Sequence, residues 1–134
     1  MRSDGRTDIG KKRVQNQDSI FFTDEPIGPL PNLYIVADGM GGHKAGDVAS
    51  KTAIECVTEY VKESAINNSV SVLKRAILYA NDKIYKMAKE NEDWKGMGTT
   101  FVAAVCEDDI LYVANIGDSR LYFIDDEIRH TVFQ

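Results

Sequence analysis

The chain has few cysteines and no long apolar run. These two absences argue against a disulfide-stabilised, zinc-binding or membrane-spanning protein. Among its 134 residues there are two cysteines, Cys56 and Cys106, far apart and each among apolar neighbours. A disulfide framework or a zinc site needs cysteines at short, fixed spacings, alone or with histidines, and no such spacing occurs. We therefore interpret both as reduced thiols of the core. No run approaches the roughly 18 apolar residues of a membrane-spanning helix.

Signals for secretion and for nucleic-acid binding are also missing. The first eight residues, MRSDGRTD, lack the apolar stretch of a signal peptide, which predicts a cytoplasmic protein. The formal net charge is −5, and no basic stripe is available to neutralise the phosphates of DNA or RNA. An acidic surface is compatible with hard cations, although surface acidity by itself usually serves solubility.

The composition is that of one soluble globular domain, with 43% hydrophobic and 28% charged residues. Strands are expected at 18–23 and at 32–37, separated by a loop that contains all three prolines. Apolar residues then recur every three to four positions over about 46–63 and again over about 70–91, as in amphipathic helices. Asn68 or Ser69 can cap the second helix.

The remainder of the chain has the pattern of strands. Segments 99–106 and 110–116 flank a short acidic turn and form an expected hairpin, and 120–124 and 128–133 form another. Both strands of the first hairpin are apolar on both faces, which predicts a place inside a layered structure. The order of strands, helix pair and strands predicts an α+β domain, with an antiparallel helix pair on a largely antiparallel sheet.

A glycine-rich loop follows Asp38, which itself ends the apolar run LYIVA. Three phosphate- or ion-binding templates fail on this loop. Lys44 stands where both a P-loop and a dinucleotide fingerprint starting at Gly39 need glycine, and an EF-hand needs more oxygen ligands than Asp38 alone. What remains is a carboxylate at a strand end whose following carbonyls can approach Mg²⁺, which accepts one or two carboxylates and keeps several waters. An ordinary Asp-Gly turn before a helix is the alternative.

Two more acidic turns favour the ion-binding interpretation. One carries Arg13, Asn16 and Asp18 just before the first strand. The other places Asp118 beside a glycine between two strands. Each residue alone is explained as a turn residue or a solvated charge, whereas together the turns are typical of one site.

Four stretches resemble the motifs of the metal-dependent protein phosphatases of the PP2C (PPM) family, in their bacterial serine/threonine form. They are TDIGKKRVQNQDS (7–19), VADGMGGHKAG (36–46), GTTFVAAV (98–105) and NIGDSRLY (115–122). They occur in the order of the family, with the helix pair in its expected place. The resemblance implies a β-sandwich flanked by helix pairs, with a binuclear Mg²⁺ or Mn²⁺ site at one end of the sheets.

The resemblance also implies which residues hold the metals. Asp38 matches the carboxylate that bridges both ions, and Gly39 matches the residue that contributes its carbonyl to one of them. Asp18 matches an acidic position that holds metal-bound water. Asp118 matches a ligand of a third, weaker metal site.

Two further residues match positions that act on the substrate, a phosphoserine or phosphothreonine protein. Arg13 matches the residue that grips the phosphate, for which a guanidinium fork is suited. His43 matches a histidine proposed to help proton transfer, and its ordinary pKa of about 6.5 suits that work. The implied reaction is in-line attack on phosphorus by a water acidified between two divalent ions. An unassigned loop histidine is the alternative for His43.

The chain departs from the family pattern in two respects. Gln17 stands where many members carry glutamate, which removes a charge beside Asp18. The catalytic domain of the family is about twice as long, and its second half supplies two further metal aspartates whose motifs do not occur after Asp118. We therefore expect residues 1–134 to be an N-terminal part of such a domain, with weak metal binding and little turnover.

Three functions remain open from the sequence. The first is part of a PP2C-type protein phosphatase. The second is a half-length, non-catalytic relative that binds phosphoproteins or metals or regulates a partner, and the third is an unrelated α+β binding module. A sandwich that lacks strands exposes edges and an apolar face, so self-association through the sheet edges is also expected.

Overall fold

The computed structural model describes residues 2–6, 18–42, 44–117, 121–124 and 129–133. In chain order its elements are β1 (Asp18–Thr23), β2 (Leu33–Met40), α1 (Ala45–Glu63), α2 (Ser69–Glu90), the 3-10 helix η1 (Glu92–Trp94), β3 (Gly98–Thr99), β4 (Phe101–Glu107), β5 (Ile110–Ile116), β6 (Leu121–Ile124) and β7 (Arg129–Phe133). Both helices lie within one residue of their expected ends.

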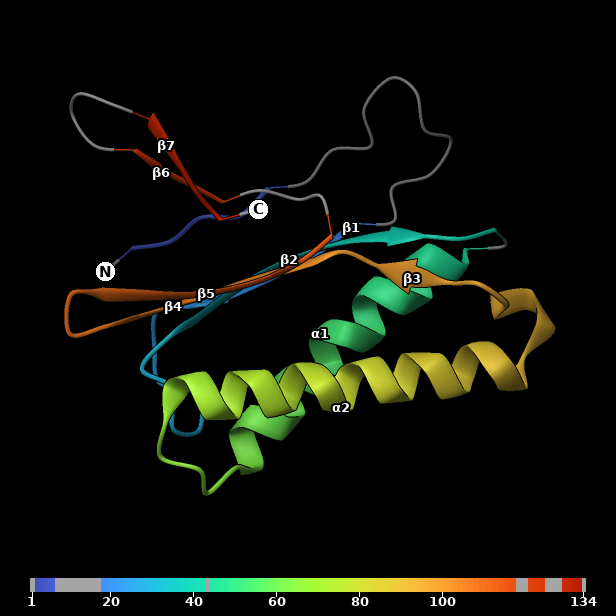
Figure 1. Ribbon diagram of the computed structural model, residues 1–134, viewed down its shortest axis with the longest axis horizontal. Coiled ribbons are helices and arrows are strands. Elements are labelled where there is room, and N and C mark those ends of the chain that lie inside the picture. Colours follow the sequence, from blue (N-terminus) through green and yellow to red (C-terminus); the bar gives the residue numbers. More distant parts are fainter. Residues whose placement is uncertain (1, 7–17, 43, 118–120, 125–128, 134) are drawn as a thin grey trace.

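The described elements form layers around one antiparallel sheet. Its strand order is β1-β2-β4-β5, with the short β3 paired to the end of β2. Helices α1 and α2 cover one face of this sheet, and the β6–β7 hairpin and residues 2–6 lie on the other side (Figure 1). The expected α+β class, with a helix pair on an antiparallel sheet, is confirmed.

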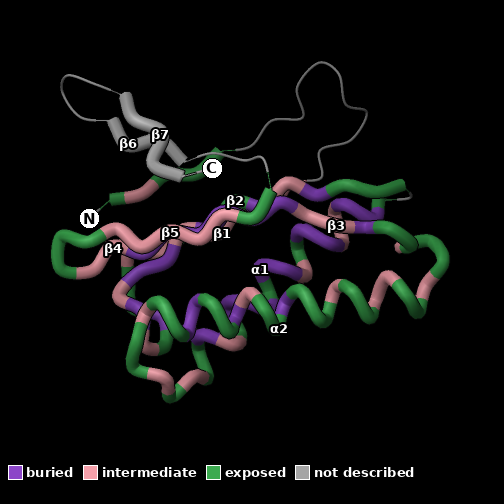
Figure 2. The backbone as a smooth tube through the Cα atoms, viewed as in Figure 1, coloured by how far each residue is buried: buried purple, intermediate pink, exposed green. Residues whose placement is uncertain are grey.

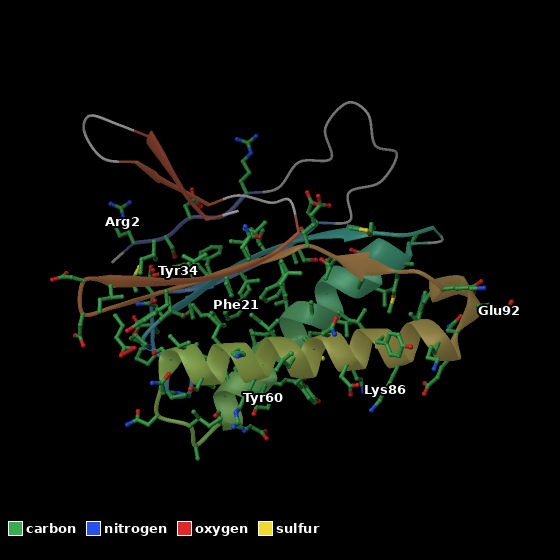
Figure 3. The ribbon with its side chains drawn as sticks, viewed as in Figure 1. Arg2, Phe21, Tyr34, Tyr60, Lys86 and Glu92 are labelled. Carbon is green, nitrogen blue, oxygen red and sulfur yellow. The ribbon has the colours of Figure 1, made fainter. Side chains whose placement is uncertain are left out.

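The core lies between the sheet and the helices. Along β2, Leu33, Ile35 and Ala37 are buried and belong to the same cluster as the apolar stripes of α1 and α2. Buried segments accordingly face one another across this layer (Figure 2), and Phe21 packs into it from β1 (Figure 3). Alternation along a strand sends the residues between them to the opposite side, which we call the helix-free face.

An amide side chain completes the β2–β4 ladder at its far end. Asn32 is buried, its Nδ2 donates to the carbonyl of Cys106 at 2.8 Å, and its Oδ1 accepts from the Cys106 N–H at 2.8 Å. The register pairs Tyr34 with Ala104 and Val36 with Val102, so Asn32 stands opposite Cys106 in the same register. The side chain therefore supplies both bonds that a main-chain pair would exchange there.

The expected cap of α2 is also present. The Asn68 side chain accepts from the N–H of Ser71 at 2.9 Å, whereas the hydroxyl of Ser69 bonds to the carboxylate of Glu107. This second bond ties the start of the helix to the β4–β5 turn.

Among the helices that the structure describes, none combines the length and the apolar character of a membrane span.

Strand β5 differs from its expected burial. Residues 101–105 of β4 are all buried, as the apolar pattern predicts. Ile110 and Ile116 of β5 are each about half exposed, at 50% and 48%, and the residues between them are intermediate. The reason is position, because β5 is the last strand of the sheet within the described residues.

Candidate functional site

Asp18 and Asp38 stand directly opposite each other on β1 and β2. The antiparallel register pairs their Cα positions, and both residues are half-buried, with Asp18 Oδ1 fully enclosed. Side chains of directly opposed residues share a face and have Cβ atoms roughly 4.5–5.5 Å apart. The structure therefore brings together two of the predicted carboxylates, from segments with a proline-rich loop between them.

Both carboxylates lie on the helix-free face. Asp38 alternates with the buried Ala37, which faces the helices, and it shares its face with Val36 and Tyr34. Next to Asp18, Ser19 faces the other way, and its hydroxyl lies 2.9 Å from that of the buried Ser50 in α1. This bond and the core hold the two strands against α1, so that the carboxylates are presented on the opposite side of the sheet.

One row across the sheet contains the carboxylates and two further residues. The β2–β3 and β2–β4 pairings share one register, which sets Thr100 opposite Asp38, and the Thr100 N–H donates to the Asp38 carbonyl at 2.9 Å. The β4–β5 register continues the row to Gly117. A Cβ on Gly117, whose φ is +103°, would lie 2.6 Å from Thr100 Cγ2. The third predicted acidic turn therefore reaches this row through its glycine.

Gly39 is oriented by the same ladder. In a strand, the N–H and C=O groups of successive residues point alternately toward one neighbouring strand and the other. The carbonyl of Asp38 points toward Thr100, on the β3–β4 side. The carbonyl of Gly39 consequently faces the β1 side, where Asp18 stands. This geometry fits the prediction that Gly39 offers a carbonyl to an ion held near the two carboxylates.

The glycine-rich loop has a packing role as well. Gly41 has a φ of +142°, and a Cβ there would lie 2.9 Å from the Cβ of Ala45, the first residue of α1. The Ala45 N–H donates to the Gly42 carbonyl at 2.8 Å. At least one glycine is therefore required by the tight passage from strand to helix, independently of any ligand.

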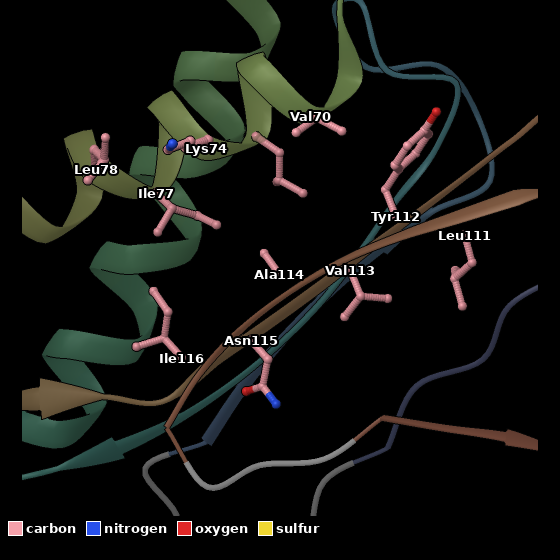
Figure 4. A pocket seen from close by; sticks show the side chains of 11 residues that line it. Val70, Lys74, Ile77, Leu78, Leu111, Tyr112, Val113, Ala114, Asn115 and Ile116 are labelled. Atoms are coloured by element: carbon pink, nitrogen blue, oxygen red, sulfur yellow. The ribbon is translucent and has the colours of Figure 1, made fainter. Parts of the chain in front are cut away.

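Three predicted site residues, Arg13, His43 and Asp118, lie outside the described residues. Three positions before Asp118 in the sequence, Asn115 pairs with Val102 and directs its side chain to the helix-free face, opposite to the side of Ala114 that faces α2 (Figure 4). Its Oδ1 is buried. Asn115 therefore lies on the same face as Asp18 and Asp38, two residue pairs along the sheet from their row.

Sequence reasoning gave no role to Thr100 and Asn115. Both occur in the stretches that resemble the family, but a threonine before an apolar strand and an asparagine before a turn are common. Only the register shows that Thr100, some 60 positions along the chain, stands opposite Asp38, and that Asn115 shares the face of Asp38 two strands away. The sequence signal that could have pointed to Thr100 is the pair of consecutive threonines, Thr99 and Thr100, at the junction of β3 and β4.

The oxygen atoms of Asp18, Asp38 and Gly39 could provide some of the ligands of a hard divalent cation. Two carboxylates and a main-chain carbonyl are the oxygen ligands that Mg²⁺ and Mn²⁺ accept. Within the described ranges, no group of three or more His, Cys, Asp or Glu residues is placed to hold a metal. The described residues thus fit one side of a metal site rather than a closed cage.

The helix-free face also contains a perturbed phenol. The hydroxyl of Tyr34 donates to Asp24 Oδ1 at 2.6 Å. Burial, followed by this bond, raises the pKa of Tyr34, and the same bond lowers the pKa of Asp24. The two pKa shifts have the same sense, because both favour a neutral phenol that donates to a charged carboxylate.

Comparison with known proteins gives the family of this fold and site. The model of the protein phosphatase 2C family matches residues 5–134. The chain belongs to the protein phosphatase 2C family. The serine/threonine phosphatase stp of Listeria innocua is 38% identical over 133 residues, which cover 96% of this chain and 52% of that protein. The resemblance inferred from the four motifs is therefore confirmed.

Solved structures of the family share the architecture. Serine/threonine phosphatase Stp1 from Staphylococcus aureus matches with a TM-score of 0.82 and 32% identity, covering 96% of this chain and 51% of that one. The catalytic domain of the phosphatase PstP, in complex with two manganese ions, matches with a TM-score of 0.79 and 31% identity, over 96% and 53%. The chain spans about half the length of the relatives that it matches.

Proposed function

We propose that this chain is the N-terminal part of a metal-dependent protein phosphatase that hydrolyses phosphoserine and phosphothreonine in proteins. The observation that carries the proposal is the pair Asp18 and Asp38, opposed on one sheet face in a chain of the protein phosphatase 2C family. The manganese ions of the PstP complex support Mg²⁺ or Mn²⁺ as the cofactor.

Each proposed ligand has a distinct task. Asp38 and the Gly39 carbonyl hold the binuclear centre, Asp18 orients water beside it, and Asp118 serves a further cation. When bound at these residues, divalent cations would lower the pKa of a coordinated water and offset negative charge on the phosphoryl oxygens.

The remaining residues act on the phosphoprotein. Arg13 binds two phosphate oxygens through its guanidinium fork and so aligns phosphorus for in-line attack. His43 delivers a proton to the departing serine or threonine oxygen.

We further propose that residues 1–134 hold only part of the ligand set. The half-length match to the relatives supports a missing second half of the domain, whose carboxylates would complete the centre. The chain alone then binds metal weakly and turns over little. The same half-length match keeps a non-catalytic, phosphoprotein-binding or regulatory role as the second candidate.

We also propose that the protein resides in the cytoplasm and that residues 1–134 self-associate through sheet edges.

Hydrolysis of p-nitrophenyl phosphate with Mn²⁺ tests the function. We expect turnover by the chain extended to the length of its relatives and little by residues 1–134. Asp38→Asn in the extended protein should lower kcat at least about 100-fold, since loss of even an outer contact costs 10- to 100-fold. Asp82→Asn, which alters an exposed carboxylate paired with Lys86, is the matched control.

Two outcomes would contradict the proposal. Robust turnover by residues 1–134 would show that the ligand set is complete without a second half. No turnover by the extended protein, with retained binding of a phosphopeptide, would favour the non-catalytic alternative.

A further inference from the structure

The ladder between β2 and the following strands changes its bonding at Asp38. In a regular antiparallel pair, two opposed residues exchange both N–H···O bonds. The Thr100 N–H does donate to the Asp38 carbonyl, at 2.9 Å. The Asp38 N–H, however, donates to the hydroxyl Oγ1 of Thr100 at 3.2 Å. A side chain thus takes the place of a main-chain carbonyl at this position.

The displaced carbonyl has a side-chain partner of its own. Thr99 Oγ1 donates to the carbonyl of Thr100 at 2.7 Å. Two consecutive threonine hydroxyls therefore replace one regular ladder bond, at the junction between β3 and β4. Because Thr100 is only 5% exposed, water cannot readily substitute for its hydroxyl.

The methyl group of Thr100 meets the next strand of the same row. Gly117 approaches so closely that a Cβ on it would lie 2.6 Å from Thr100 Cγ2 and 2.9 Å from Thr100 Cβ. Thr100 therefore contacts the main chain on both sides, Asp38 through its hydroxyl and Gly117 through its methyl.

We infer that Thr100 is a positioning residue that fixes the main chain of Asp38 through its hydroxyl and thereby sets the metal affinity of the site. The metal part of this inference rests on the proposed function. The hydroxyl bond fixes the peptide plane that precedes Asp38. This plane sets how the Asp38 side chain leaves the helix-free face and how the next carbonyl, that of Gly39, is turned toward β1.

Two substitutions at Thr100 separate the hydroxyl from the methyl. Thr100→Val keeps the shape and removes the hydroxyl, leaving the Asp38 N–H without this acceptor. Thr100→Ser keeps the hydroxyl and removes the methyl. The matched control is Thr58→Val on α1, since Thr58 is also buried and its hydroxyl donates to a main-chain carbonyl, that of Ile54 at 2.9 Å.

The first measurement needs no metal. Amide hydrogen exchange of Asp38, followed by NMR, reports opening of its N–H bond. We expect at least about tenfold faster exchange in Thr100→Val than in the wild-type chain, at matched global stability, and near wild-type exchange in Thr100→Ser and Thr58→Val.

The second measurement is Mn²⁺ affinity, read from paramagnetic broadening of the amide signals of Asp18 and Gly39 during titration, which detects weak binding. We expect Thr100→Val to bind about tenfold more weakly, as for loss of an outer contact at a metal site. Thr100→Ser should restore most of the affinity, and Thr58→Val should leave it unchanged.

The outcomes distinguish this inference from the proposed function. Unchanged Asp38 exchange in Thr100→Val, or faster exchange with unchanged Mn²⁺ affinity, would overturn the positioning role while the proposed function stands. If the wild-type chain showed no broadening at Asp18 and Gly39 even at millimolar Mn²⁺, the metal part of this inference would be overturned for residues 1–134. The proposed function would still be decided by turnover of the extended protein. Equal loss of affinity in Thr58→Val would reduce the Thr100 effect to general destabilisation.

Discussion

At the scale of single residues, side chains stand in for main-chain groups at both ends of the β2–β4 ladder. Asn32 supplies both bonds to Cys106 at one end, and the Thr100 hydroxyl accepts from Asp38 at the other. A buried main-chain group without a partner costs about 1–3 kcal/mol. The ladder therefore ends at defined residues, one of which is a proposed metal ligand.

Tyr34 makes the alkaline stability of the chain dependent on one phenol. Its pKa is raised in the folded state by burial and by its bond to Asp24, so the stabilisation is complete below the unfolded value near 10 and is lost as the pH rises above it. We expect the stability advantage over Tyr34→Phe to be constant from about pH 7 to 9 and to shrink above about pH 10. Urea unfolding across this range measures it, and a pH-independent difference would contradict the assignment.

The residue scale also shows what the sequence could predict. Asp18, Asp38 and Gly39 could be predicted as site residues because their stretches resemble family motifs and because a carboxylate at a strand end has recognisable chemistry. The structure shows that Asp18 and Asp38 are opposed. The role of Thr100 could not be predicted, since it depends on which residue of a distant strand stands opposite Asp38. Register is set by the packing of whole elements, which no local pattern encodes.

At the scale of elements, the β4–β5 hairpin contains local strain. Asp108 and Asp109 connect Glu107 with Ile110 and have φ values of +51° and +64°. Two positive φ angles define a type I′ turn, for which Asn-Gly and Asp-Gly are preferred. The chain thus places a residue with a Cβ where glycine is favoured.

Replacement of Asp109 by glycine should stabilise the chain. The left-handed conformation costs a residue with a Cβ roughly 1 kcal/mol, and the greater freedom of glycine in the unfolded state offsets part of the gain. We expect Asp109→Gly to raise the free energy of unfolding by about 0.5 kcal/mol and Asp109→Ala to lower it, by thermal and urea denaturation. A gain with alanine would show that the loss of acidic repulsion, not backbone strain, is responsible.

Sequence periodicity predicted where helices and strands occur better than it predicted how deeply each strand is buried. The 3.6-residue repeat and the Asn68 cap gave both helices nearly to the residue, because these signals are local. Burial of β5 was overestimated, since an apolar strand at a sheet edge has the same sequence pattern as one in the middle. Whether a strand has a neighbour is a property of the topology.

At the scale of the whole molecule, apolar surface gathers at the β5 edge. A hollow of about 400 Å³ lies between α2 and β5 (Figure 4), and Val70 and Leu78 on its rim are 52% and 59% exposed. Ile110 and Ile116 are similarly exposed at the two ends of β5. Within the described residues no strand covers this edge, and unprotected edges of this kind pair with other chains.

We therefore expect residues 1–134 to self-associate through β5. Light scattering should show a mass that rises with concentration, and Ile110→Lys combined with Ile116→Lys should return the chain to a monomer, because two charges on the edge oppose strand pairing. Tyr85→Lys is the control, since Tyr85 is 61% exposed on α2 and is not part of the hollow. A wild-type chain that remains monomeric near millimolar concentration would contradict the prediction. An equal effect of Tyr85→Lys would instead assign the association to general apolar surface rather than to the β5 edge.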